Sequence, residues 1–251
     1  LHVKGHGDTL ITLAELAKLT ALSMEEVKED VSLLESQGLV CVFPMRKDTY
    51  VWHADSRREA EQTLEKTLRA YEEKYPYRYG MKKAEVWATH FQKIKPNVFD
   101  KILELLIDAG CLKRVDEFLC TPEYEVRKDK TYDNVSKLLL DTFAKARYDF
   151  VRYSEIEFKG VDRMTGDDIL NILLEEQKIV KVTEDMYTLK EYMESAKEAI
   201  QKKLKEDPLI TIAQVRDLFE TSRKSAKPIL EYMDSIKVTK KTGAESERIA
   251  Y

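Results

Sequence analysis

Glycine and cysteine are scarce in this sequence, and long apolar runs are missing. The eight glycines form neither a P-loop nor a dinucleotide-binding fingerprint, because only Gly5 and Gly7 stand close together. No apolar run approaches the roughly 20 residues that a membrane-spanning helix needs, and the first residues do not resemble a signal peptide. With 43% hydrophobic and 35% charged residues, the composition predicts a cytoplasmic, globular protein with highly charged surfaces.

The three cysteines are too few and too widely spaced for a disulfide framework. They are Cys41, Cys111 and Cys120. Each falls in a segment with the pattern of a strand or of core, where a free cysteine usually acts as a small hydrophobe. We therefore expect all three to be buried structural residues.

Residues that could perform catalysis or hold a metal do not gather into a site. His2 and His6 lie beside the two neighbouring glycines, but no third ligand is evident. His53 and His90 stand alone on segments flanked by apolar residues, and helical spacing explains most of the acidic residues as solvated helix faces. The sequence therefore predicts no metal site, no cofactor and no enzymatic activity for these residues.

Four segments share one pattern: an apolar-periodic helix, a short break and then β-branched or apolar residues. The helices end at Gly38, Gly110, Lys178 and Lys237, which are spaced 72, 68 and 59 residues apart. Glycine is the usual left-handed residue just past a helix, and lysine takes that conformation at a small cost. The pattern indicates divergent repeats of one structural unit.

Signals for helix starts precede each of these breaks. Capping boxes are predicted at Thr12…Glu15, Ser154…Glu157 and Thr211…Gln214. Further helix starts are predicted at Ser23…Glu26, at Pro96, at Thr165…Asp168 and at Ser222. Two short helices joined by a tight turn form a helix-turn-helix.

Two strand-like runs around a polar turn follow the helices, as in the wing of a winged helix. The clearest pairs are 39–43 with 49–52, 179–182 with 186–189, and 236–241 with 248–251, the last enclosing a turn at 242–247. Long amphipathic helices at about 56–75, 131–147 and 190–206 begin the second, third and fourth segments. The predicted fold is mainly α with small β hairpins, in four tandem winged-helix domains at 1–54, 55–125, 126–189 and 190–251.

The charge balance is uneven along the chain. A net charge of −4 argues against a protein that coats nucleic acid over its whole surface, but not against one basic face. Residues 221–241 carry six basic and two acidic side chains. A helix N-terminus and a basic wing there would together bind a nucleic-acid backbone, through Thr221, Ser222, Arg223, Lys224, Lys227, Lys240 and Lys241. The alternative is a basic face that is merely solvated.

An aromatic-rich stretch at 71–80 allows two interpretations. Its tyrosines could stack on bases or on a partner protein, or they could form a packed turn between two helices. The packed turn is the interpretation that the sequence favours.

Two stretches resemble the selenocysteine-specific translation elongation factor family of bacteria (the SelB family). Residues 221–241, TSRKSAKPILEYMDSIKVTKK, are similar to the closing signature of that family, and Pro76–Met81 is similar to a P-x-R-x-G-M turn in its second winged helix. Lys237 stands where the family has glycine, and the wing turn is longer than usual. The resemblance implies the C-terminal part of the factor. Its last winged helix would bind the selenocysteine insertion hairpin of messenger RNA, and the whole factor would be a GTPase that acts on the ribosome.

Two other functions remain open. A regulator of double-stranded DNA would need base-reading side chains along a whole recognition helix, whereas the helix here turns apolar after Lys227. Recognition of an RNA loop, through backbone contacts and an extruded base, suits such a helix better. A scaffold whose modules all bind other proteins is the second alternative. The first three segments fit that description because they lack obvious basic clusters, and in the first one Glu25, Glu26, Glu29 and Asp30 would repel a phosphate backbone.

Overall fold

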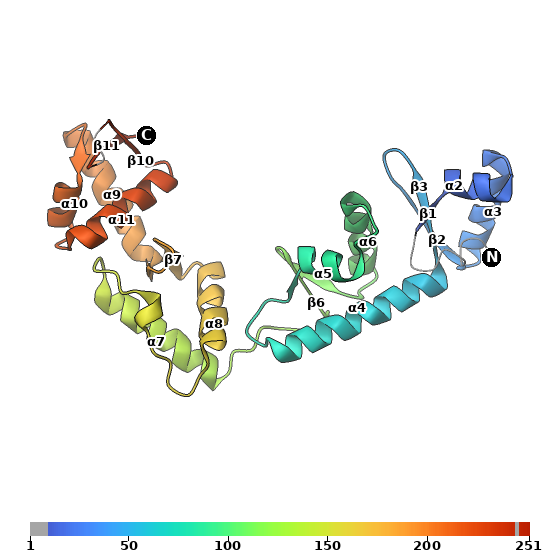
Figure 1. The fold of residues 1–251 in the computed structure, drawn as a ribbon, viewed down its shortest axis with the longest axis horizontal. Helices are drawn as coiled ribbons and strands as arrows, with labels where there is room; N and C mark the ends of the chain where they lie inside the picture. Colours follow the sequence, from blue (N-terminus) through green and yellow to red (C-terminus); the bar gives the residue numbers. More distant parts are fainter. Residues whose placement is uncertain (1–9, 244–245) are drawn as a thin grey trace. The chain divides into compact units, whose positions relative to one another are not determined.

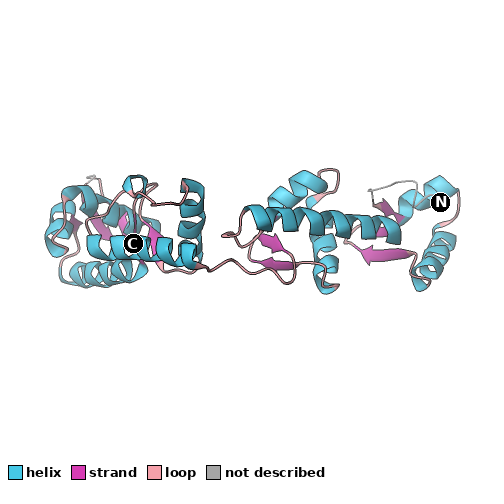
Figure 2. Ribbon diagram, turned by 90° about the horizontal axis from the view of Figure 1, so that it is seen from below, coloured by secondary structure: helices cyan, strands magenta, loops and turns pink. Residues whose placement is uncertain are grey.

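The computed structural model describes residues 10–243 and 246–251. The chain divides into two compact units, Leu1–Val126 and Arg127–Tyr251. Figure 1 follows the chain through them, and Figure 2 shows short strands among a majority of helices, as predicted. The predicted boundary at 125/126 lies next to this division, and the other two boundaries fall inside the units.

The first unit opens with two helices and a three-stranded sheet. Its elements are β1 (Ile11–Thr12), α2 (Leu13–Thr20), α3 (Met24–Ser36), β2 (Val40–Pro44) and β3 (Thr49–His53). The sheet is antiparallel in the order β1-β3-β2. The predicted capping box at Thr12 is present, and the predicted helix start at Ser23 has the same form. The hydroxyls of Thr12 and Ser23 accept from the N–H groups of Glu15 and Glu26, and their own N–H groups donate to those two carboxylates. These boxes satisfy backbone donors at the helix starts and so fix where α2 and α3 begin.

A long helix then leads into a second group of the same kind. Its elements are α4 (Ala54–Lys74), β4 (Met81–Lys82), α5 (Lys83–His90), α6 (Pro96–Asp108), β5 (Lys113–Val115) and β6 (Phe118–Cys120). Phe43 and Trp52 of the β2–β3 hairpin belong to the same apolar core as Leu64, Ile102 and Leu119. The two groups of the first unit therefore share buried side chains rather than forming separate cores.

The second unit repeats the arrangement with one incomplete helix. Its elements are α7 (Lys130–Ala146), the 3-10 helix η1 (Tyr153–Glu155), α8 (Arg163–Glu175), β7 (Ile179–Lys181), β8 (Tyr187–Leu189), α9 (Lys190–Glu206), β9 (Ile210–Thr211), α10 (Ile212–Leu218), α11 (Arg223–Ser235), β10 (Thr239–Lys241) and β11 (Glu247–Ala250). Phe150 and Met186 pack into the core of α9–α11. The capping box of Thr211 with Gln214 is present and starts α10.

Two helix starts differ from the prediction. The predicted capping box at Ser154…Glu157 is wrong: Tyr153–Glu155 form a single 3-10 turn, and Ser154 donates from its N–H and its hydroxyl to Asp185, at 2.9 and 2.5 Å. Helix α8 begins at Arg163 with Asp162 as its N-cap, so Thr165 lies inside it. Ser154 donates to a carboxylate that is distant in the sequence, and a pattern of neighbouring residues cannot predict such a partner.

The helices α3, α6, α8 and α11 end with the same backbone geometry. Gly38, Gly110, Gln177 and Lys237 all have a positive φ, of 71°, 71°, 54° and 58°. In each case the next residue donates its N–H to a carbonyl five positions back, at 2.9 to 3.0 Å, as in a Schellman motif. The left-handed residue of the third helix is therefore Gln177 and not the predicted Lys178.

The prediction that all three cysteines are buried holds only for Cys120. Cys120 is 1% exposed, whereas Cys41 and Cys111 are half-buried at the edge of the same core. Burial raises the pKa of the Cys120 thiol to about 11. The expectation that all three are buried is wrong for Cys41 and Cys111.

Candidate nucleic-acid interface

The first turn of α11 presents positive charge to solvent. Its N-cap Ser222 accepts from Ser225 N–H through its hydroxyl, and Arg223 and Lys224 follow as exposed residues. Among the described residues, the N–H groups of Arg223 and Lys224 meet no acceptor. Two cationic side chains and two open N–H groups thus coincide at the positive end of a helix dipole, which is the arrangement that binds a phosphate.

One face of α11 after the first turn packs into the core. Ala226, Ile229, Leu230 and Met233 are 0% exposed. Lys227 is half-buried, and its Nζ lies 3.8 Å from Glu231 Oε1 one turn later, which offsets part of its charge. Arg223 and Lys224 in the first turn are therefore the fully exposed cations of this helix.

The predicted wing contributes two exposed lysines. Lys240 and Lys241 lie in β10, opposite Ile249 and Arg248 of β11. Consecutive strand residues face opposite sides, so the two ammonium groups extend on different sides of β10. Residues 244 and 245 of the predicted wing turn lie outside the described residues, as do His2, His6, Gly5 and Gly7.

A buried ion pair joins α11 to the wing and was not predicted from the sequence. Arg248 is 0% exposed, and its Nε donates to Asp234 Oδ2 at 2.7 Å, while Thr239 donates to Asp234 Oδ1 at 2.6 Å. Asp234 closes α11, Thr239 opens β10 and Arg248 lies in the central strand β11. The three side chains thereby hold the wing against the helix whose first turn is basic.

Thr221 has a different position from the other predicted site residues. Its side chain is buried, and its hydroxyl lies 2.6 Å from Asp149 Oδ1 and 2.8 Å from the carbonyl oxygen of Tyr148. Ser222 N–H donates to the same Asp149 oxygen at 3.0 Å. These bonds hold the pKa of the Asp149 carboxyl below its usual range. Thr221 therefore anchors the helix start and does not offer its hydroxyl to a ligand.

The aromatic stretch before Met81 forms a packed turn. The Arg78 guanidinium lies 3.9 Å from the Tyr75 ring centroid, and Tyr124 donates to the carbonyl oxygen of Arg78 at 2.9 Å. Gly80 has φ 141°, and an added Cβ would lie 2.3 Å from the Leu119 carbonyl oxygen, so the turn requires glycine. The favoured interpretation of this stretch as a packed turn agrees with these contacts.

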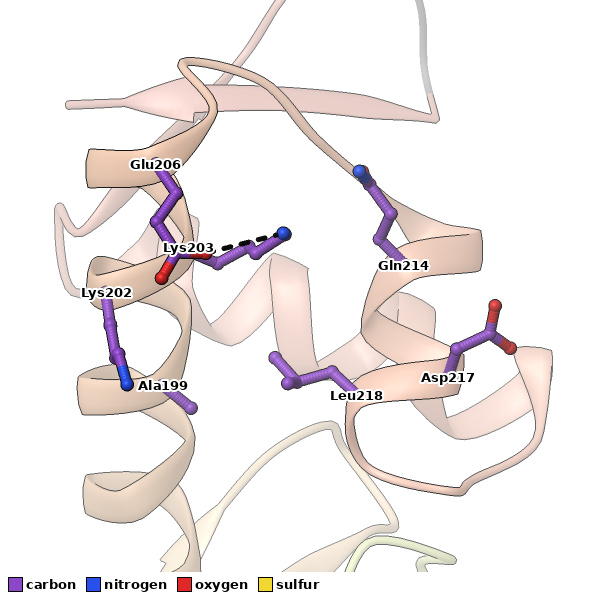
Figure 3. A pocket seen from close by; sticks show the side chains of 7 residues that line it. All are labelled: Ala199, Lys202, Lys203, Glu206, Gln214, Asp217 and Leu218. Atoms are coloured by element: carbon purple, nitrogen blue, oxygen red, sulfur yellow. Dashed lines mark ion pairs between the residues drawn. The ribbon is translucent and has the colours of Figure 1, made fainter.

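A groove of about 550 Å³ lies in the second unit between α9 and α10 (Figure 3). It is lined by Ala199, Lys202, Lys203, Glu206, Gln214, Asp217 and Leu218. Lys203 and Glu206 form an ion pair at 3.6 Å, and the two lysines are balanced by two carboxylates. None of the predicted site residues lines this groove.

In the described part of the chain, no cluster of three or more histidine, cysteine, aspartate or glutamate side chains could hold a metal. No helix among the described residues is long and apolar enough to cross a membrane.

Two stretches of the chain match models of one known family. Residues 66–119 and 202–245 each match a model described as "Elongation factor SelB, winged helix". The first covers the region from α4 to β6, and the second covers the region from α9 to the start of the wing. Each of the two units thus contains one stretch that matches a winged-helix domain.

A curated relative extends the similarity over almost the whole chain. It is a "Selenocysteine-specific elongation factor" of Desulfomicrobium baculatum, 24% identical over 246 residues. The alignment covers 97% of this chain and 38% of the relative, so the chain spans less than half the length of that protein. The chain carries SelB-type winged-helix domains, and its resemblance to the C-terminal part of the selenocysteine-specific elongation factor is confirmed.

Two solved structures are also similar. The "bacterial selenocysteine-specific elongation factor EF-Sec" matches with a TM-score of 0.47 and 16% identity, over 84% of this chain and 32% of that one. The "mRNA-binding domain of elongation factor SelB from E.coli in complex with SECIS RNA" matches with a TM-score of 0.38 and 20% identity, over 49% of this chain and 98% of that one. Both TM-scores lie below 0.5.

Proposed function

We propose that this chain is the messenger-RNA-binding region of a selenocysteine-specific elongation factor. It binds the selenocysteine insertion (SECIS) hairpin and links it to a GTPase and tRNA-delivery part that precedes it in the whole factor. The observation that carries this proposal is the first turn of α11, with exposed Arg223 and Lys224 and two open N–H groups, inside a stretch that matches a SelB winged-helix model.

The proposal includes an architecture of four tandem winged helices. It is supported by the four Schellman-type helix ends at Gly38, Gly110, Gln177 and Lys237, each followed by a strand pair. The four modules would act in the cytoplasm, in a monomeric factor, and the chain itself would catalyse no reaction. The fourth module would bind RNA, while the first two would connect it to the rest of the factor or to the ribosome.

Charge distribution supports this division of roles. Helix α3 occupies the place of the recognition helix in the first segment, yet it carries Glu25, Glu26, Glu29 and Asp30 on exposed positions. Such carboxylates repel a phosphate backbone. RNA contacts by α3 are therefore disfavoured, and a protein contact fits that surface better.

A binding comparison tests the function. The full chain is titrated with a SECIS hairpin from the organism that encodes it, with a hairpin of scrambled loop sequence and with duplex DNA of matched length, each at several salt concentrations. We expect tightest binding to the SECIS hairpin, with a salt dependence set by a few phosphate contacts. Preference for the duplex would favour the DNA regulator, and no nucleic-acid binding would favour the protein scaffold.

A further inference from the structure

The basic start of α11 is held by a turn that belongs to the preceding segment. Residues 147–149 follow the end of α7 and reach the turn between α10 and α11 within the second unit (Figure 1). We propose that Asp149 is a positioning residue for RNA binding: it fixes the first turn of α11 so that Arg223 and Lys224 meet the hairpin in one orientation. This inference rests on the proposed function.

The first support is the double contact that Asp149 makes. One carboxylate oxygen accepts from the Thr221 hydroxyl at 2.6 Å and from Ser222 N–H at 3.0 Å. Ser222 is the N-cap of α11, so this carboxylate holds the residue that sets where the helix starts. The exposed cations Arg223 and Lys224 follow directly in the chain.

The second support is the packing beside that contact. The Tyr148 ring lies 4.5 Å from the Phe219 ring and 5.8 Å from the Tyr192 ring, measured between centroids. Its hydroxyl donates to the Tyr192 carbonyl oxygen at 3.3 Å. Tyr148 is therefore clamped between α9 and the end of α10, which leaves Asp149 little freedom to move away from Ser222.

The third support is the backbone of the turn itself. Arg147 has φ 51° and ψ −106°, which a side-chain-bearing residue rarely adopts. Its carbonyl oxygen accepts from the Thr188 hydroxyl, 3.1 Å away, and Thr188 is 1% exposed. Strain of this kind persists only where the surroundings determine the conformation, and it is typical of functional segments.

The sign of the charge makes the proposal testable. A carboxylate beside a phosphate-binding turn repels RNA, so an effect of charge alone predicts that its removal strengthens binding. Positioning predicts the opposite for a variant that loses the hydrogen bonds. Asparagine separates the two effects, because it removes the charge and keeps an oxygen that accepts both bonds.

The experiment uses the full chain and four variants, Asp149→Ala, Asp149→Asn, Thr221→Val and Thr221→Ser, with Glu157→Ala as an exposed-carboxylate control in the same unit. Affinity for the SECIS hairpin is measured beside hydrogen exchange of the Ser222, Ser225 and Ala226 amides and a thermal melt. We expect Asp149→Ala and Thr221→Val to weaken binding by about fivefold or more and to speed exchange of the hydrogen-bonded amides of Ser222, Ser225 and Ala226. Asp149→Asn, Thr221→Ser and the control should bind at least as well as the parent.

Each other outcome has a definite meaning. Faster exchange with unchanged affinity overturns the positioning role and leaves the proposed function standing. Tighter binding by Asp149→Ala also overturns it, since only the charge would then matter. If Asp149→Ala lowers the melting temperature so far that it cannot be assayed, Thr221→Val against Thr221→Ser decides alone. A parent chain that binds no hairpin refutes the proposed function itself and, with it, this role.

Discussion

Replacing Asp234 with alanine should destabilise the second unit, because it breaks the ion pair that joins α11 to the wing. The substitution leaves the guanidinium of Arg248, which is 0% exposed, without the carboxylate that now lies 2.7 Å from its Nε. It also removes the acceptor of the Thr239 hydroxyl, and Thr239 is fully buried. Breaking a buried ion pair on one side costs about 3–5 kcal/mol. Asp234 is 21% exposed, so water reaches it, and we expect the lower end of that range.

The assay is a thermal melt or urea titration of the full chain, followed by a probe in the second unit. A loss of ~3 kcal/mol corresponds to a fall of roughly 10 °C for a unit of this size. Arg248→Met should cost less, because Asp234 can be hydrated and keeps its bond to Thr239. In the double variant, the cost should be clearly smaller than the sum of the two single costs, because no buried charge remains. The reasoning fails if the two single costs simply add, or if Asp234→Ala melts like the parent.

The remaining predictions concern the basic turn, a glycine and a thiol. Arg223→Ala should weaken hairpin binding by about 1–3 kcal/mol, and Lys224→Ala by less, with each lost phosphate contact flattening the salt dependence by a slope of about 0.7–0.9. Unchanged binding at every salt concentration by a normally melting double variant would place the interface elsewhere. Gly80→Ala should lower the melting temperature of the first unit by much more than Gly110→Ala. A Cβ at position 80 would lie 2.3 Å from a backbone carbonyl oxygen, whereas a Cβ at position 110 meets open space. Equal melting temperatures would contradict this. Cys120, whose pKa burial raises to about 11, should resist a thiol reagent at pH 8 until denaturant is added, and fast native labelling would disprove that.

The sequence predicted most helix starts because their signals are local. Thr12, Ser23, Thr211 and Ser222 all cap a helix at the predicted place, through hydrogen bonds to residues three positions ahead. Ser154 fits the same local pattern, yet Asp185 takes its hydrogen bonds from 31 positions away. A sequence pattern describes only hydrogen bonds between neighbouring residues, and an acceptor brought close by the tertiary fold can replace such a bond.

In the candidate site, too, local features could be predicted from the sequence, whereas features that depend on distant residues could not. The exposure of Arg223 and Lys224 follows from their place before the apolar face of α11, which the sequence displays. The burial of Thr221 does not, because its acceptor Asp149 lies 72 residues earlier in the chain. The burial of Arg248 is harder still to predict from the sequence. Side chains alternate between the two faces of β11, and a charged residue would not be expected at the fully buried position. Arg248 is buried because Asp234, 14 residues away, supplies the opposite charge.

These contacts divide the stretch 221–241, which carries the resemblance, into two kinds of residue. Thr221, Asp234 and Thr239 form hydrogen bonds that fix the helix start and the wing, and all three are turned toward the protein. Arg223 and Lys224 extend into solvent and are the groups that a phosphate can reach. A matching stretch can therefore preserve the shape of the module while its RNA contacts change. Similarity of the whole stretch therefore says little about RNA binding. Variants that keep these hydrogen bonds, compared with variants that lose them, are more informative. The affinity of the exposed pair depends on charge, whereas the contribution of the buried set depends on geometry.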